Sequence, residues 1–177
     1  ALPLIFRVGP TLSLSIATLA ILSGLLYTGG PRPFGYLGLG ELFVALFFGP
    51  VALLGTYYVQ TLTLPLEIAL FSFAPGLFST ALLVANNLRD QEGDAEQGKK
   101  TLVVRFGAKF GAWEYTLSLL FPFLLALPFT TLPLLMIPLS ISPIQTAFRK
   151  ENLPSLLPTT ARLFLLYTLL FAIGLFL

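Results

Sequence analysis

The side chains best suited to chemistry lie in one polar stretch, residues 86–109, of an otherwise apolar chain. Within it, Asn86, Asp90 and Asp94 recur at every fourth position. On a helix this spacing places all three on one face, with neighbouring Cβ atoms about 6 Å apart. Two carboxylates that close repel each other unless a cation lies between them, and Mg²⁺ binds through one or two carboxylates, water and phosphate oxygens. The spacing therefore predicts that Asp90 and Asp94 bind Mg²⁺ and act in catalysis.

Basic residues follow the acidic ones in the same stretch. Lys99, Lys100 and Arg105 lie within reach of a phosphate bound near the carboxylates, which suits a metal–diphosphate pair better than a metal ion alone. The competing interpretation is a solvated loop of mixed charge, because a lone D-x-x-x-D pattern is weak evidence. The order of the charges, and their position where a membrane helix ends, favour a functional site.

The composition places this site in an integral membrane protein. Of the 177 residues, 56% are hydrophobic and only 10% are charged, whereas a soluble domain carries roughly 25% charged residues. Cysteine and histidine are both absent. Their absence excludes disulfides, thiolate or imidazole metal sites, and Ser-His or Cys-His nucleophiles. Acid–base or metal chemistry must therefore use Asp, Glu, Lys, Arg or Tyr.

The apolar segments predict an all-α bundle of about six transmembrane helices in a single domain, residues 1–177. The predicted spans cover residues 11–27, 41–60, 64–88, 112–129, 131–144 and 161–177. Gly49-Pro50 predicts a kink in the second span, and Pro75-Gly76 predicts an interruption in the third.

The segment between the first two predicted spans, residues 28–40, is too rich in glycine and proline for a regular helix. It is either an interhelical turn or a loop near the site, with Arg32 and Tyr36 facing the headgroup region. Glu41 is the first residue of the second span. A negative charge is favourable at a helix N-terminus, and this explains the presence of Glu41 as well as a catalytic role would.

The basic residues predict the orientation in the membrane. Alternation of the six spans places residues 28–40, 86–111 and 145–162 on one side, with residues 145–160 as a polar connector. All lysines and arginines except Arg7 then belong to that side: Arg32, Arg89, Lys99, Lys100, Arg105, Lys109, Arg149, Lys150 and Arg162. Because basic residues are enriched on the cytoplasmic side, the polar site is predicted to face the cytoplasm.

The stretch NNLRDQEGDAEQGKKTLVVRFG resembles the second aspartate-rich motif of the UbiA superfamily of membrane prenyltransferases. Residues 27–60 resemble the branch of that family that prenylates 1,4-dihydroxy-2-naphthoate, in menaquinone and phylloquinone biosynthesis. The resemblance covers most of residues 20–110 and implies a fold of about nine helices, with two aspartate motifs facing each other across a cavity. No Asp precedes Asp90, so the first motif has no counterpart. The six predicted spans match the last six helices, and the chain is expected to be the C-terminal part of such an enzyme, or half of one completed by another chain.

The resemblance also implies the reaction. A prenyl diphosphate would bind with its head at the cytoplasmic rim and its tail in an apolar groove open to lipid. Asp90 and Asp94 would hold Mg²⁺, and Asn86 would give the ion an amide oxygen or orient a bound water. The naphthoate ring would attack the allylic cation, with loss of its carboxylate. The remaining substrate-binding residues expected are Asn86, Asn87, Arg89, Lys99, Lys100, Arg105 and Tyr36, and nucleic acid is not an expected partner.

Two alternatives stay open. Within the superfamily, the acceptor could instead be 4-hydroxybenzoate, homogentisate, chlorophyllide or haem. Outside it, the chain could be half of a transporter or an interaction subunit, because helices broken by glycine and proline, such as residues 41–60 and 64–88, also occur in transporters. Transport explains the acidic-then-basic stretch poorly.

Overall fold

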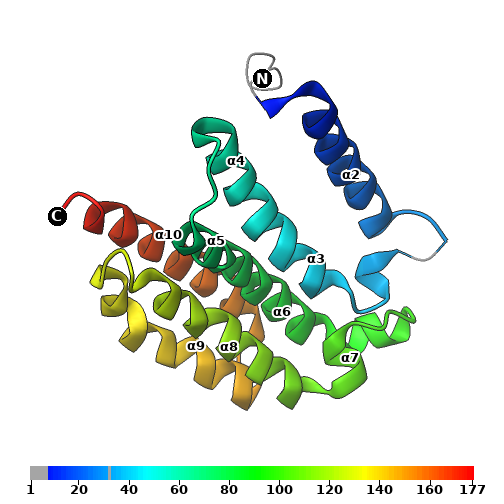
Figure 1. Ribbon diagram of the computed structural model, residues 1–177. Helices are drawn as coiled ribbons and strands as arrows, with labels where there is room; N and C mark the ends of the chain where they lie inside the picture. Colours follow the sequence, from blue (N-terminus) through cyan, green and yellow to red (C-terminus); the bar gives the residue numbers. More distant parts are fainter. Residues whose placement is uncertain (1–7, 32) are drawn as a thin grey trace.

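The computed structural model describes residues 8–31 and 33–177, which are helical with no strand among them (Figure 1). In chain order the elements are α2 (Pro10–Thr28), the 3₁₀ turn η1 (Phe34–Tyr36), α3 (Gly40–Leu46), the π-helical turn η2 (Phe47–Val51), α4 (Ala52–Thr61), α5 (Leu66–Phe71), α6 (Phe73–Glu96), α7 (Leu102–Phe106), α8 (Ala108–Ala126), η3 (Leu132–Met136), α9 (Ile137–Arg149), η4 (Leu153–Ser155) and α10 (Leu156–Gly174). The predicted all-α fold is confirmed. The positions expected for Arg7 and Arg32 lie outside the described residues.

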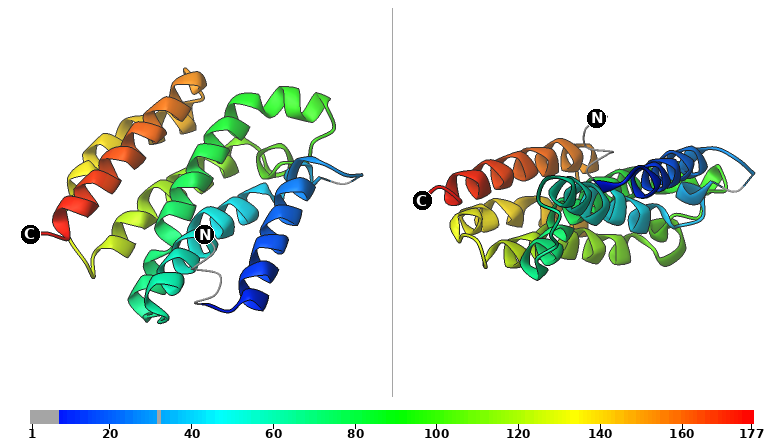
Figure 2. Two further views of the ribbon diagram at one scale, coloured as in Figure 1. Left: turned by 90° about the horizontal axis from the view of Figure 1, so that it is seen from above. Right: turned by 45° about the horizontal axis from the view of Figure 1, so that its top comes forward.

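Within residues 8–31 and 33–177, four helical units are long and apolar enough to cross a membrane: Pro10–Thr28, Gly40–Thr61, Leu66–Glu96 and Leu153–Gly174. These agree with the first, second, third and last predicted spans. The other two predicted spans also form helices, α8 and α9, but neither of these is both long and apolar enough to be counted with the four units. The chain is therefore a membrane helical bundle in which α8 and α9 pack beside the four more apolar units (Figure 2).

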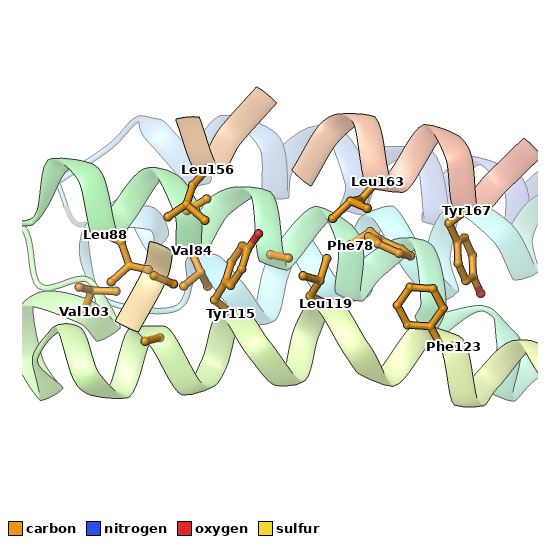
Figure 3. Packing of buried hydrophobic residues seen from close by; sticks show 14 of the residues in the cluster. Phe78, Val84, Leu88, Val103, Tyr115, Leu119, Phe123, Leu156, Leu163 and Tyr167 are labelled. Atoms are coloured by element: carbon orange, nitrogen blue, oxygen red, sulfur yellow. The ribbon is translucent and has the colours of Figure 1, made fainter. Parts of the chain in front are cut away.

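Helix α6 is the central element of the bundle. It packs along α8 on one side and against α3 on the other, and α10 closes the core formed by α6 and α8 (Figure 3). The fully buried aromatic side chains of this core include Phe78 of α6 and Tyr115 and Phe123 of α8. Two hydroxyl groups in the core are hydrogen-bonded, as a membrane interior favours: the Tyr115 hydroxyl and Thr160 Oγ1 lie 2.7 Å apart, and the Tyr167 hydroxyl donates to the Pro122 carbonyl at 2.8 Å.

Both predicted breaks in the spans occur, one of them at a shifted position. Gly49 has non-helical backbone angles within the π-helical turn, which confirms the kink expected at Gly49-Pro50. The third span breaks at Ser72, between α5 and α6, and not at Pro75-Gly76. Because proline lacks an N–H, it leaves unbonded the carbonyl four residues earlier, so the helix is interrupted on the N-terminal side of Pro75.

The last two predicted spans have wrong boundaries. Residues 145–160 were expected as a polar connector, but α9 continues to Arg149 and α10 begins at Leu156. Only about six residues, including the short turn η4, join the two helices. Hydropathy detects the part of a helix that lies in hydrocarbon, and these two helices extend beyond that part into a polar region.

Helix α2 stands at the edge of the bundle, beside α3 and α4 (Figures 1 and 2). It has no buried residue, and its main packing partner is the turn η1 that follows it. Grooves lined by residues of α2 on one side and of α3 and α4 on the other therefore run along this edge.

Candidate functional site

The acidic residues predicted as ligands lie at the C-terminal end of α6, the central helix. Helix α6 extends to Glu96, so the four-residue spacing of Asn86, Asp90 and Asp94 does place them on one helical face. Gly98, at φ +72°, then turns the chain back, and the Lys99 N–H donates to the Asp94 carbonyl at 2.9 Å. A residue with a side chain rarely adopts this backbone conformation, so the glycine is what returns Lys99 to the end of α6.

Each carboxylate on this face is paired with a cation. Arg89 donates through Nε and Nη2 to the two carboxylate oxygens of Asp90, at 2.7 Å each, and its Nη2 also donates to Asn86 Oδ1 at 2.5 Å. The Lys99 ammonium donates to Asp94 Oδ1 at 2.6 Å. The hydrogen bond to Asp94 raises the pKa of Lys99 above its ordinary value, which keeps the ammonium charged.

The loop that contains Tyr36 docks on the polar stretch. The Lys99 ammonium lies 5.2 Å from the centroid of the Tyr36 ring, a cation–π arrangement, and the Lys100 N–H donates to the Tyr36 carbonyl at 2.8 Å. Gly38, at φ +76°, makes this approach possible, because a Cβ atom there would lie 2.6 Å from the Lys100 carbonyl oxygen.

Two of the predicted substrate-binding residues, Lys100 and Arg105, lie apart from this cluster. The side chain of Lys100 is exposed, and its backbone N–H makes the contact with the loop. Arg105 is exposed at the end of α7, near Gly38. Asn87 lies on the α3 side of α6, where its Nδ2 donates to Glu41 Oε1 at 2.7 Å.

A polar cavity of about 110 Å³ lies between these elements. Its walls include two acidic side chains that are nearly inaccessible, Glu41 (5% exposed) and Asp94 (7% exposed). The remaining polar lining is Tyr27, Thr28, Tyr36, Asn87, Lys99 and Thr101.

An apolar groove of about 400 Å³ lies between α2 and the α3–η2 segment. It is lined by Ala20, Ser23, Gly24, Tyr27, Phe43, Val44, Phe47 and Phe48. Tyr27 lines both the groove and the polar cavity, so the two spaces meet at this residue. The arrangement suits an amphiphile that has a charged head and a hydrocarbon tail.

Glu41 and Tyr27 are site residues that the sequence analysis did not include. Glu41 did carry a signal, as an acidic residue at the start of an apolar span, but that position equally suits a helix N-terminus. Its partner Asn87 is 46 residues away, and no local pattern predicts such a contact. Tyr27 carried no signal beyond its place at the end of the first span.

The oxygens of Asn86, Asp90 and Asp94 are hard donors of the kind that Mg²⁺ prefers, so the residues present fit this ion. Among the described residues, no group of three or more Asp, Glu, His or Cys side chains is close enough to form a complete metal site. Two carboxylates and an amide are what a Mg²⁺ ion needs from the protein when water and phosphate complete its shell.

The fold and the site together define an integral membrane helical bundle with paired acidic and basic side chains at one end of its central helix. The sequence model of the UbiA prenyltransferase family matches residues 2–150, and the chain belongs to this family. This confirms the resemblance seen in the aspartate-rich stretch.

Relatives with similar sequences include three proteins named 1,4-dihydroxy-2-naphthoate octaprenyltransferase. The protein from Escherichia coli is 37% identical over 177 residues, which covers 93% of this chain and 57% of the relative. The Haemophilus influenzae protein is 47% identical over 54% of this chain and 31% of the relative. The Mycobacterium tuberculosis protein is 48% identical over 53% of this chain and 32% of the relative. The chain thus spans about half the length, or less, of these curated relatives.

Proposed function

We propose that this protein is a prenyltransferase that transfers a polyprenyl group from a prenyl diphosphate to 1,4-dihydroxy-2-naphthoate. The observation that carries the proposal is the meeting of the polar cavity and the apolar groove at Tyr27. The names of the three bacterial relatives support the choice of acceptor. Family membership supports the transfer reaction.

The charged groups at the end of α6 are proposed to hold the diphosphate head. Before it binds, Arg89 and Lys99 are paired with Asp90 and Asp94. When Mg²⁺ and the diphosphate arrive, the two carboxylates and Asn86 would hold the ion, and the guanidinium and ammonium groups would donate to phosphate oxygens. Bound Mg²⁺ would supply neutralisation of the charge that develops on the leaving diphosphate.

The apolar groove is proposed to hold the hydrocarbon tail. Its lining offers aromatic and aliphatic surface from Phe43, Phe47 and Phe48 on one side and from α2 on the other. Since Tyr27 borders the polar cavity as well, a chain lying in the groove would have its first carbons next to the charged end of α6. The reacting bond would then lie at the boundary between the two spaces.

The site is proposed to face the cytoplasm. Residues 33–40, residues 86–111 and the α9–α10 junction lie at one end of the bundle, as contacts between Lys100 and Tyr36 and between the rings of Trp113 and Phe148 indicate. The basic residues gather at this end, which is the pattern of a cytoplasmic face. The expectation that a second aspartate motif, from preceding helices or another chain, completes the site stays a prediction.

The test is to express the protein from its complete coding sequence, purify it in detergent and supply octaprenyl diphosphate with 1,4-dihydroxy-2-naphthoate. We expect a prenylated naphthoquinol that forms with Mg²⁺ and not after chelation of the ion. Parallel reactions with 4-hydroxybenzoate and homogentisate measure acceptor choice. A folded protein that forms product only with one of these other acceptors, or with none, would refute the proposal.

A further inference from the structure

Glu41 is an acidic side chain buried in a membrane protein without a cationic partner among the described residues. It is 5% exposed, and its Oε1 accepts a hydrogen bond from the neutral amide of Asn87. The ion pairs found in residues 8–31 and 33–177 join Arg89 to Asp90 and Lys99 to Asp94. Because a buried carboxylate is costly in a membrane helix, such residues usually mark a functional site.

A purely structural role explains this position poorly. Glu41 lies in the first turn of α3, where a negative charge favours the helix N-terminus. That effect needs only proximity to the first turn and would be served as well by an exposed acidic residue. Burial in the wall of a polar cavity adds a cost that the helix does not require.

The chemistry of the cavity limits the kinds of ligand that Glu41 can bind. The diphosphate head is proposed to bind where Arg89 and Lys99 provide cations, and Glu41 is paired with neither of them. A metal ion is disfavoured at Oε1, because this oxygen already accepts the Asn87 N–H and a metal ion would compete with that donor. The partner that remains is a neutral hydrogen-bond donor such as a hydroxyl group, since hydrogen bonds to an ionised acceptor are the stronger kind.

Other groups in the same cavity fit an aromatic hydroxy acid. Lys99 uses one of its three N–H donors for Asp94, which leaves others for a carboxylate. The rings of Tyr27 and Tyr36 flank the space. A Cβ atom at Gly40 would lie 3.1 Å from the Tyr27 hydroxyl, so the absence of a side chain there lets this ring lie close to Glu41.

From this geometry we infer that Glu41 accepts a hydrogen bond from a ring hydroxyl of the aromatic acceptor and so determines acceptor specificity. Asn87, which donates to the same carboxylate, is its positioning residue. The cavity of about 110 Å³ is smaller than a typical small-molecule pocket, so it receives the hydroxyl-bearing edge of the ring system. This inference rests on the proposed prenyltransferase function.

The test compares the protein with its Glu41→Gln variant, both expressed from the complete coding sequence. Glutamine keeps the size of the side chain and an oxygen that can accept from Asn87, but it removes the charge. We expect the KM for 1,4-dihydroxy-2-naphthoate to rise about tenfold or more, as for the loss of a hydrogen bond to a charged group. The KM for octaprenyl diphosphate should change less than about twofold.

A second measurement identifies the hydroxyl group directly. The two monomethyl ethers of the naphthoate are tested as competitive inhibitors, so that no turnover of the ethers is needed. In the unchanged protein, methylation of the hydroxyl that faces Glu41 should weaken inhibition about tenfold relative to the other ether. In Glu41→Gln this difference should disappear.

The matched control is Glu67→Gln, because Glu67 is exposed on α5 and is the first-turn acid of that helix, as Glu41 is of α3. It should leave both KM values unchanged. Three results for Glu41→Gln would each overturn the inference while leaving the prenyltransferase assignment intact. These are equal increases in both KM values, an unchanged KM for the acceptor, and retained discrimination between the ethers. A wild-type protein that does not prenylate the naphthoate would overturn the proposed function, and the inference with it.

Discussion

Asp94 is the residue whose substitution tests the candidate site most directly. It is 7% exposed, lines the polar cavity, and is bonded to Lys99 at 2.6 Å. Asp94→Asn keeps the shape of the side chain and removes one of the two carboxylates proposed to hold Mg²⁺. It also releases the Lys99 ammonium from its present position.

The size of the expected loss in rate follows from the proposed role of the Mg²⁺ ion. Metal ions supply several kcal/mol of charge stabilisation in such transfers. Losing about 3 kcal/mol of it corresponds to a roughly 150-fold slower turnover. We therefore expect the rate constant of Asp94→Asn to fall by about two orders of magnitude, and its half-saturating Mg²⁺ concentration to rise about tenfold or more.

The assay measures initial rates of product formation over a range of Mg²⁺ concentrations, with octaprenyl diphosphate and the naphthoate at saturation. Glu92→Gln is the matched control, because Glu92 is an exposed acid on the same helix and lies outside the Asn86–Asp90–Asp94 face. It should behave like the unchanged protein within about twofold. Near-normal turnover and Mg²⁺ dependence in Asp94→Asn would show that the site is assigned to the wrong residues.

Three further predictions concern the fold and its orientation. The chain has no cysteine of its own, so Gln97→Cys should react with an impermeant thiol reagent only from the cytoplasmic side, and labelling from outside would contradict the orientation. Gly76→Ala should lower the free energy of unfolding by about 1–3 kcal/mol, because its Cβ would overlap the α3 backbone. Gly55→Ala, in open space on α4, is the control and should not lower it. Equal thermal midpoints for the two variants would refute the packing argument. Tyr115→Phe should cost about 1 kcal/mol through loss of its hydrogen bond with Thr160, and a double-mutant cycle with Thr160→Val that shows no coupling would exclude that bond.

The helical placement of the acidic residues could be predicted from the sequence because it is a local property. A four-residue spacing has one consequence on a helix, and α6 does extend past Asp94. The pairing of Lys99 with Asp94 is harder to predict from the sequence, since it depends on the turn at Gly98 and on the path of the chain after it. Spacing alone places basic residues near acidic ones without saying which pairs form.

The contact between Glu41 and Asn87 could not be predicted at all, because it joins two helices whose packing is set by distant features. One of these is the crossing where Gly49 and Gly76 meet: a Cβ atom at Gly49 would lie 3.1 Å from the Gly76 Cα. Two glycines let the backbones of η2 and α6 approach closely, as small residues do in membrane bundles. That approach places α3 alongside the end of α6 and brings Glu41 to Asn87.

The pairing of charges at the end of α6 explains how such a site can exist beside hydrocarbon before any ligand binds. Asp90 is neutralised by Arg89 and Asp94 by Lys99, so the cluster carries no unpaired charge at the membrane boundary. In the proposed reaction, Asp90 and Asp94 would hold Mg²⁺ in place of their present cations, and Arg89 and Lys99 would donate to phosphate oxygens. Each charged group of this cluster then has a counter-ion both before and after binding. Pairing within the protein therefore offsets the desolvation cost of bringing these charges together. Glu41 lies outside this cluster, and its hydrogen bond with the neutral amide of Asn87, in place of a cation, is why we assign it to a neutral donor on the acceptor.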